Sequence, residues 1–201
     1  FMLNLNHNRI TKVLTATFLT AVSAQSLAAT APSTVSVTVQ NTFTLTEDTA
    51  LSFGTVRATA DPNGVANIGT LVLAADGTTS TTAVGNSSMT QLAAGSVGQF
   101  TVTNAAPFTN LTITFPADFE LTAAAAPPGS PNFDILQADW TAIIRGGAND
   151  GVAYAAGNLQ TDVAGTVSFD AGTSLKTDAT VTTSAYIDAA YSGNYTMTVD
   201  Y

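Results

Sequence analysis

Close pairs of carboxylates are the residues in this sequence with the best claim to catalysis. Two such pairs occur, Glu47 with Asp48 and Asp118 with Glu120. Glycoside hydrolases use two carboxylates about 5–10 Å apart across a substrate cleft. Those clefts usually also present several aromatic platforms to the sugar, and this chain has one tryptophan, Trp140. We therefore interpret both pairs as carboxylates of solvated turns and expect no catalytic residue.

Other catalytic and metal-binding groups are scarce. The only histidine, His7, lies in a segment that we expect to be removed, and there is no cysteine. Ser-His-Asp and Cys-His catalysis need one of these groups, and so do the usual zinc sites. The turns DPNG (61–64) and GGANDG (146–151) supply oxygen ligands of the kind calcium prefers, but neither has the spacing of a twelve-residue calcium loop. We expect no enzyme activity, no cofactor and no metal.

The first 28 residues have the organisation of a secretory signal peptide. Three basic side chains, His7, Arg9 and Lys12, precede the apolar run Val13–Val22, and small residues follow up to Ala29. An apolar run of about 10 residues is too short to cross a bilayer, which needs about 20. We expect a mature chain that begins at Ala29 and is exported through the periplasm to the exterior of a bacterial cell.

The mature chain is acidic and sparsely charged. Three bases (Arg57, Arg145 and Lys176) against 14 acids give it a net charge of −11. Such a surface repels nucleic acid and anionic lipid, which excludes both as partners. A secreted chain without cysteine must be held by packing or by its neighbours. Its Thr- and Val-rich composition favours strands, whose exposed edges must be hidden or used.

Short strands between clusters of Gly, Asn, Asp and Pro dominate the chain after Ala29. This pattern is typical of two packed antiparallel sheets in one all-β domain. We expect an N-terminal extension over 29–41 and a β-sandwich over 42–201. The segments 77–88 and 121–131 are predicted to be loops, because the first is a polar tract and prolines interrupt the second. About nine strands are predicted, over 34–46, 51–56, 68–77, 98–104, 110–116, 133–147, 165–172, 180–188 and 195–199.

Two segments near the ends alternate apolar and polar residues. In the first, Val35, Val37 and Val39 share one face, and Phe43 and Leu45 continue the same parity beyond Asn41. At the C-terminus, one parity is shared by Tyr195, Met197, Val199 and Tyr201. A strand with this alternation buries one face and exposes the other, so we expect the chain to end on a structural strand.

Three motifs in this order carry a resemblance to a known family. They are LSFGTV (51–56), GQFTVTN (98–104) and the terminal GNYTMTVDY (193–201). Together they resemble a family of secreted bacterial domains of unknown function. That family is similar to spore-coat-U-like proteins and to the archaic pilins of chaperone–usher pili. The absence of the cysteine pair that many of those pilins carry leaves the subfamily open.

The resemblance implies an immunoglobulin-like antiparallel sandwich that lacks one strand. A periplasmic chaperone fills the gap first, and the N-terminal extension of the next subunit then replaces it while an outer-membrane usher guides the exchange. It implies a homopolymer, a structural subunit of an extracellular pilus-like filament with no membrane contact in its mature form. The implied donor strand carries Val35, Val37, Val39, Phe43 and Leu45. The implied groove-bordering strand carries Tyr195, Met197, Val199 and Tyr201.

An alternative interpretation of the same residues stays open. The segment STVSVTV (33–39) also fits the first strand of a sandwich that is complete by itself. The protein would then be a monomeric secreted coat or surface protein, with carbohydrate or calcium as its ligand.

Overall fold

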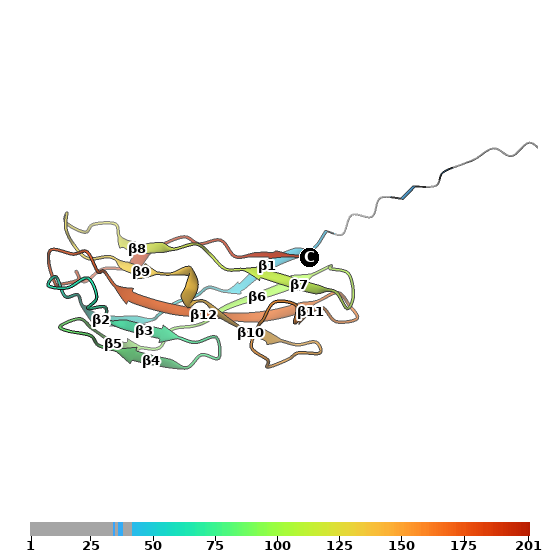
Figure 1. The fold of residues 1–201 in the computed structure, drawn as a ribbon, viewed down its shortest axis with the longest axis horizontal. Coiled ribbons are helices and arrows are strands. Elements are labelled where there is room, and N and C mark those ends of the chain that lie inside the picture. Colours follow the sequence, from blue (N-terminus) through green and yellow to red (C-terminus); the bar gives the residue numbers. More distant parts are fainter. Residues whose placement is uncertain (1–33, 35, 38–41) are drawn as a thin grey trace, which may run out of the picture. The chain divides into compact units, whose positions relative to one another are not determined.

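The computed structural model describes Thr34, residues 36–37 and residues 42–201. The predicted signal peptide (1–28) and the donor residues Val35 and Val39 lie outside these residues, whereas Val37 is described and 85% exposed. Contacts group Gln40–Tyr201 into one compact unit, called the domain below. Figure 1 shows its strands.

The domain is built from strands, so the predicted all-β class is confirmed. The one helical element among the described residues is the 3-10 turn η1 (Gln137–Asp139). The strands are β1 (Thr44–Thr49), β2 (Thr55–Thr59), β3 (Thr70–Leu73), β4 (Thr79–Thr82), β5 (Ser88–Ala93), β6 (Gly98–Thr103), β7 (Asn110–Thr114), β8 (Phe119–Ala123), β9 (Phe133–Ile135), β10 (Thr141–Arg145), β11 (Leu159–Gln160), β12 (Val167–Thr177), β13 (Tyr191–Ser192) and β14 (Thr198–Asp200).

All strand pairings in the described part of the chain are antiparallel, and they form three sheets. The largest follows the order β1-β6-β12-β9-β8-β13, with β10 and the β3–β4 pair also joined through β12. The smaller sheets are β11-β7-β14 and β2-β5. The long strand β12 (orange in Figure 1) pairs with β6 and β10 in its first half and with β3 and β9 in its second. This strand therefore holds most of the domain together.

One hydrophobic core joins the largest sheet to the β11-β7-β14 sheet. It contains Phe100 of β6, Ile113 of β7, Phe169 of β12 and Val199 of β14. The rings of Phe100 and Phe169 stack with centroids 5.2 Å apart, because these residues are direct cross-strand partners. In β6 and β7 every second residue is buried while its neighbours are more exposed, as a period of two requires.

Several predicted segments are corrected by the structure. The polar tract 77–88, predicted to be a loop, contains β4 and the start of β5, and β8 runs into the predicted loop at 121–131. All four residues of β4 are exposed, because this strand pairs only with β3 and covers no core. Conversely, the predicted strand over 180–188 is irregular and makes a single bridge, from Ala185 to Thr59. The segment 133–147 divides into β9, η1 and β10.

Candidate functional site

The first and the last strand of the domain, β1 and β14, each have an open edge, and the two edges lie side by side. Strand β1 pairs with β6 and strand β14 with β7, and among the described residues neither has a partner on its other edge. The ring of Phe43 meets that of Tyr201 at 5.3 Å, and the hydroxyl of Tyr195 donates to Glu47 Oε1 at 2.8 Å. These contacts run in opposite order along the two segments. The β1 segment and the C-terminal segment 193–201 are therefore antiparallel neighbours with no backbone ladder described between them.

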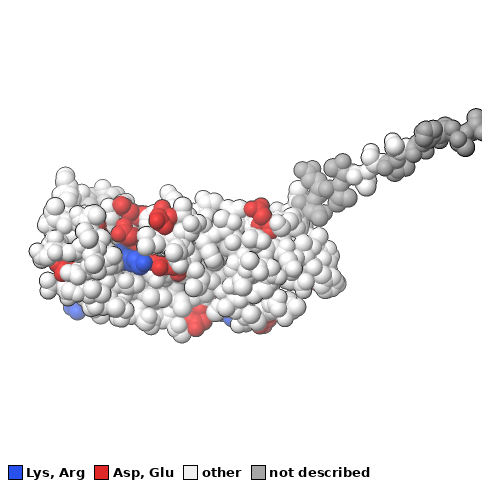
Figure 2. Space-filling view, viewed as in Figure 1, with Lys and Arg blue, Asp and Glu red and all other residues white. Residues whose placement is uncertain are grey.

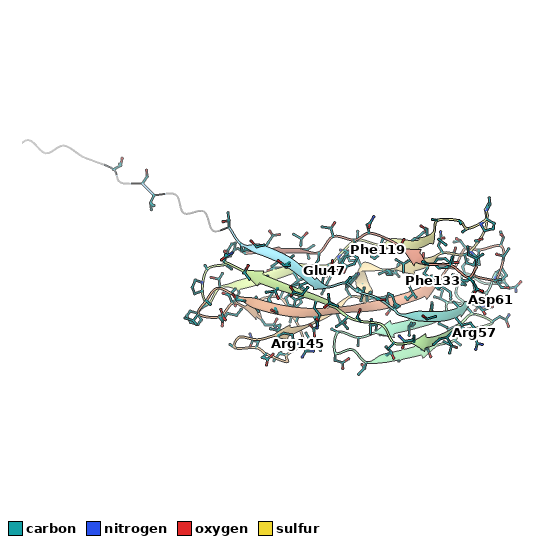
Figure 3. All side chains as sticks on the ribbon, turned by 180° about the vertical axis from the view of Figure 1, so that it is seen from behind. Glu47, Arg57, Asp61, Phe119, Phe133 and Arg145 are labelled. Atoms are coloured by element: carbon teal, nitrogen blue, oxygen red, sulfur yellow. The ribbon has the colours of Figure 1, made fainter. Side chains whose placement is uncertain are left out.

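A groove separates these two segments. Its first part, about 480 Å³, lies between Leu45, Glu47 and Leu51 on one side and Tyr195 and Met197 on the other. It shares Leu51, Gly193 and Tyr195 with a second cavity of about 800 Å³, which extends past β2 to the segment 186–190. Figure 3 shows Glu47, Phe119 and Phe133, three of the lining residues, spaced along one side of the domain. We name the two parts together the edge groove.

Apolar side chains form most of the floor of the edge groove. In the second part they come from β8, β9 and β12 beneath the two edges: Phe119, Leu121, Phe133, Ile135 and Leu175. Phe133, Ile135 and Leu175 belong to the buried core. The edge groove is therefore a place where the core of the domain reaches the surface between two strand edges.

The course of the chain between β1 and β2 explains why the groove stays open. Within this stretch Ser52 bridges to Ser96, and the chain then leaves β6 to pair with β5. Gly54 has φ +73°, and a Cβ placed there would lie 2.2 Å from the carbonyl oxygen of Ala93. Only glycine allows both this conformation and this approach. The chain that forms this wall thus passes at Gly54 from the sheet of β1 to the sheet of β2. This change of sheet directs β2 away from the C-terminal segment.

The C-terminal residues alternate as their sequence predicts. Met197 and Val199 are buried while Thr196 and Thr198 are exposed, although the ladder itself covers only β14. Tyr195 and Met197 line the edge groove; Val199 packs in the core opposite Ile113, and Tyr201 closes the end of the domain against Phe43. Burial, together with the hydrogen bond to Glu47, raises the pKa of Tyr195, so its phenol stays protonated as the donor.

Phe43 and Leu45, two residues of the predicted donor strand, pack within their own domain. Leu45 is the cross-strand partner of Val102 in β6, and Phe43 packs on Tyr201 of the same chain. While β1 stays paired with β6, neither side chain is free to enter a neighbouring molecule. In the single chain Phe43 and Leu45 thus belong to the packing of their own domain. The donor role expected for them and for the three valines stays a prediction.

The acidic pairs are used as hydrogen-bond acceptors for separate parts of the fold. Glu47 accepts from Tyr195 and Asp48 from the hydroxyl of Thr101. The carboxylate of Asp118 accepts from the backbone N–H of Gln137, and that of Glu120 from the side-chain amide of Asn132. Within the part of the chain that the structure describes, no three metal-ligating side chains converge on one point.

The DPNG turn holds a buried carboxylate among several hydrogen-bond donors. Asp61 is 1% exposed and accepts hydrogen bonds from the backbone N–H groups of Asn86 and Asn63 and from the side-chain amides of Asn67 and Asn63. The bond from Asn86 contributes most to lowering the pKa of Asp61 to about 2. This network ties the 61–67 turn to the 84–87 turn, which accounts for the polar residues of the motif.

A second group of acids lies on β8 and β9 and beside β12. Asp134 is the cross-strand neighbour of both Glu120 and Lys176, while the ammonium of Lys176 binds Asp139 at 2.6 Å. Acidic atoms gather around one basic group on the face drawn in Figure 2. Burial, and then the charges of Asp178 and Glu120, raise the pKa of Asp134 from 3.8 to about 6, against the opposing effect of Lys176.

Because of Asp134, the domain is expected to be more stable in mild acid than at neutral pH. Its folded-state pKa lies above the unfolded value, so the folded form disfavours the charged carboxylate and loses stability as the pH rises from about 4 to about 6. We expect Asp134→Asn to raise the thermal midpoint at pH 7.5 and to flatten its dependence between pH 4 and 6. Asp200→Asn, an exposed carboxylate of β14, is the matched control. Parallel midpoint curves for Asp134→Asn and the wild type would contradict the assignment.

Family models, curated protein sequences and solved structures were each searched, and none matches. In the described part of the chain, no helix has the length and hydrophobicity that a membrane crossing requires.

Proposed function

We propose that this protein is a structural subunit of an extracellular filament, and that its domain is an immunoglobulin-like sandwich completed by a strand from a neighbouring copy. The observation that carries the proposal is the edge groove. It lies between two strand edges that have no second partner among the described residues, and its floor is the core. An open edge above an apolar floor is the arrangement that an added strand completes.

A strand in the edge groove would satisfy both edges at once. The β1 segment and the segment 193–201 run antiparallel, so an intervening strand is parallel to one and antiparallel to the other. Its backbone would pair with N–H and C=O groups that β1 and β14 present without a partner among the described residues. Alternate side chains would point into the floor, and the others would face solvent.

The extension over 29–41 has the properties that such a strand needs. It contains no charged residue, so it carries no charge into an apolar groove, and Val35, Val37 and Val39 alternate. Its 13 residues, when extended, span about 43 Å. The groove wall runs from Leu45 to Ala58, a stretch of similar length in residues. Each valine that becomes fully buried contributes about 1.5–3 kcal/mol.

Strand donation between copies gives a filament when each extension enters the groove of the next molecule. The receiving copy offers its own extension in turn, so the contact is heterologous and the assembly stays open. Such an assembly needs no disulfide, which fits a chain without cysteine. A secretory signal over 1–28, a periplasmic chaperone and an outer-membrane usher belong to the same proposal.

The test compares two triple variants of the extension. Val35, Val37 and Val39 are replaced by serine in one, and Thr34, Ser36 and Thr38, which have the opposite parity, are replaced by alanine in the other. We expect the first to remove filaments from electron micrographs and the second to leave them. Filaments built from the valine variant, or a wild-type chain that remains a stable monomer, would contradict the proposal and favour a self-complete surface protein.

A binding measurement examines the groove directly. The chain lacking Thr30–Val39 should stay monomeric and bind a synthetic peptide of residues 29–41. Trp140, the single tryptophan, lies 5.3 Å from the ring of Tyr195, which lines the groove, so its fluorescence should respond to the peptide. A peptide with the three valines replaced by serine should give no response.

A further inference from the structure

Two loops at the C-terminal end of the domain expose large apolar side chains. Phe108, between β6 and β7, is 64% exposed, and Val163, between β11 and β12, is 74% exposed. Their neighbours Pro107 and Ala164 are also exposed. We name these four residues the apical patch. The end of the domain near the C-terminus is mostly free of charged atoms on the face drawn in Figure 2.

Hydrogen bonds join the two loops into one platform. The buried hydroxyl of Thr161 donates to the carbonyl of Ala106 at 2.7 Å and accepts from the N–H of Thr109 at 2.9 Å. The N–H of Phe108 donates to the carbonyl of Asp162 at 3.3 Å. One oxygen of the Asp162 carboxylate accepts from the N–H groups of Ala164 and Thr166, each at 2.8 Å. The exposed side chains therefore stand on a fixed backbone.

Phe108 adopts a backbone conformation that bulky residues avoid. Its φ is +53°, in the left-handed region that glycine and asparagine tolerate best. Among the described residues, the one other non-glycine position with positive φ is occupied by an asparagine, Asn104. A phenylalanine that is both strained and largely exposed is expected to add little to the stability of a single domain. Strain of this kind persists where a side chain has a function outside the fold.

The apical patch lies at the end where the extension joins the domain. The hydroxyl of Tyr201 accepts from the N–H of Ala106 at 3.3 Å, beside the patch, and the ring of Tyr201 contacts Phe43. The chain N-terminal to Thr42 therefore connects to the domain next to the patch. A second copy that takes the extension into its edge groove is brought against Phe108 and Val163.

We infer that the apical patch docks on a second copy of this chain, at the far end of that copy's edge groove. The inference rests on the proposed function and adds the contact between globular domains. Contact between two apical patches would let a pair of molecules exchange extensions and close as a dimer, so an open filament requires opposite ends to meet. The far part of the groove offers Leu92, which is 61% exposed, and the exposed Ala189 and Ala190.

The lack of cysteine in the chain allows a direct test. Val163→Cys and Ala189→Cys are introduced separately and together into the full-length chain, and filaments are oxidised and analysed by denaturing gel electrophoresis. We expect a ladder of covalent multimers from the double variant and from none of the single variants. Disulfide-linked dimers of the Val163→Cys single variant would show that two apical patches contact each other, and they would overturn the inference. Filaments without a ladder would overturn it while leaving strand donation in place.

A second pair of variants measures the strength of the contact. Phe108→Asn keeps a residue that tolerates positive φ, and combined with Val163→Ser it removes both large apolar groups. We expect filaments of the double variant to dissociate at lower urea concentration than wild-type filaments, with unchanged unfolding of the single chain. Equal filament stability would overturn the inference. If the wild-type chain forms no filaments, the proposed function fails and the docking contact fails with it.

Discussion

Removing Val199, Asp200 and Tyr201 is expected to destabilise the domain by at least about 3 kcal/mol, a large part of the stability of a typical domain. The deletion takes a buried valine from the core, where it faces Ile113, and removes most of the ladder between β14 and β7. It also removes the ring that packs on Phe43. The last three residues therefore hold the small sheet and the start of β1 in place.

Urea unfolding of the single chain, followed by the fluorescence of Trp140, measures this loss. Trp140 is 5% exposed and is the only tryptophan, so its emission reports on the core. Thr198→Ala is the matched control, because Thr198 is exposed in the same strand and the substitution leaves the ladder intact. If the truncated chain unfolds at the urea midpoint of the control, the terminal strand has no structural role.

The strands that sequence analysis located correctly are those that contribute to the core. In β6 and β7 the apolar residues recur with a period of two, because one face of each strand is buried. Strand β4 gives no such signal, since it pairs along an edge with all its side chains in solvent. The segment 180–188 gives a false signal: its alternating residues pack as irregular chain around Tyr186, whose ring stacks on Phe133.

The edge groove could be anticipated only in part. The alternation of the C-terminal residues identified a segment with one buried face, and Tyr195 and Met197 do line the groove. The facing wall depends on where the chain changes sheets, and that change requires the close approach of Gly54 to Ala93. A glycine in a strand-like segment indicates a bulge or a close approach without saying which partner is approached. Pairing between distant strands therefore had to come from the structure.

Phe169→Ala is expected to cost about 3–5 kcal/mol, the range for deleting a buried phenylalanine ring. Phe169 is fully buried in β12, the strand that joins most of the largest sheet, and its ring stacks on Phe100 of β6. The neighbouring backbone is fixed by pairing with both β6 and β10, so the core cannot collapse into the space that the ring leaves.

The same substitution at Phe108 shows whether the loss of stability comes from the burial of the ring or from the residue type alone. Phe108 is 64% exposed, so Phe108→Ala keeps the backbone conformation and should change the stability of the single chain by no more than about 0.5 kcal/mol. Urea unfolding followed by Trp140 fluorescence should therefore place Phe169→Ala far below the wild type and Phe108→Ala beside it. Similar midpoints for the two variants would mean that the core is not centred on β12. A large loss from Phe108→Ala would mean that its ring serves the fold of its own domain, which would remove the reason to assign that ring to a neighbouring molecule.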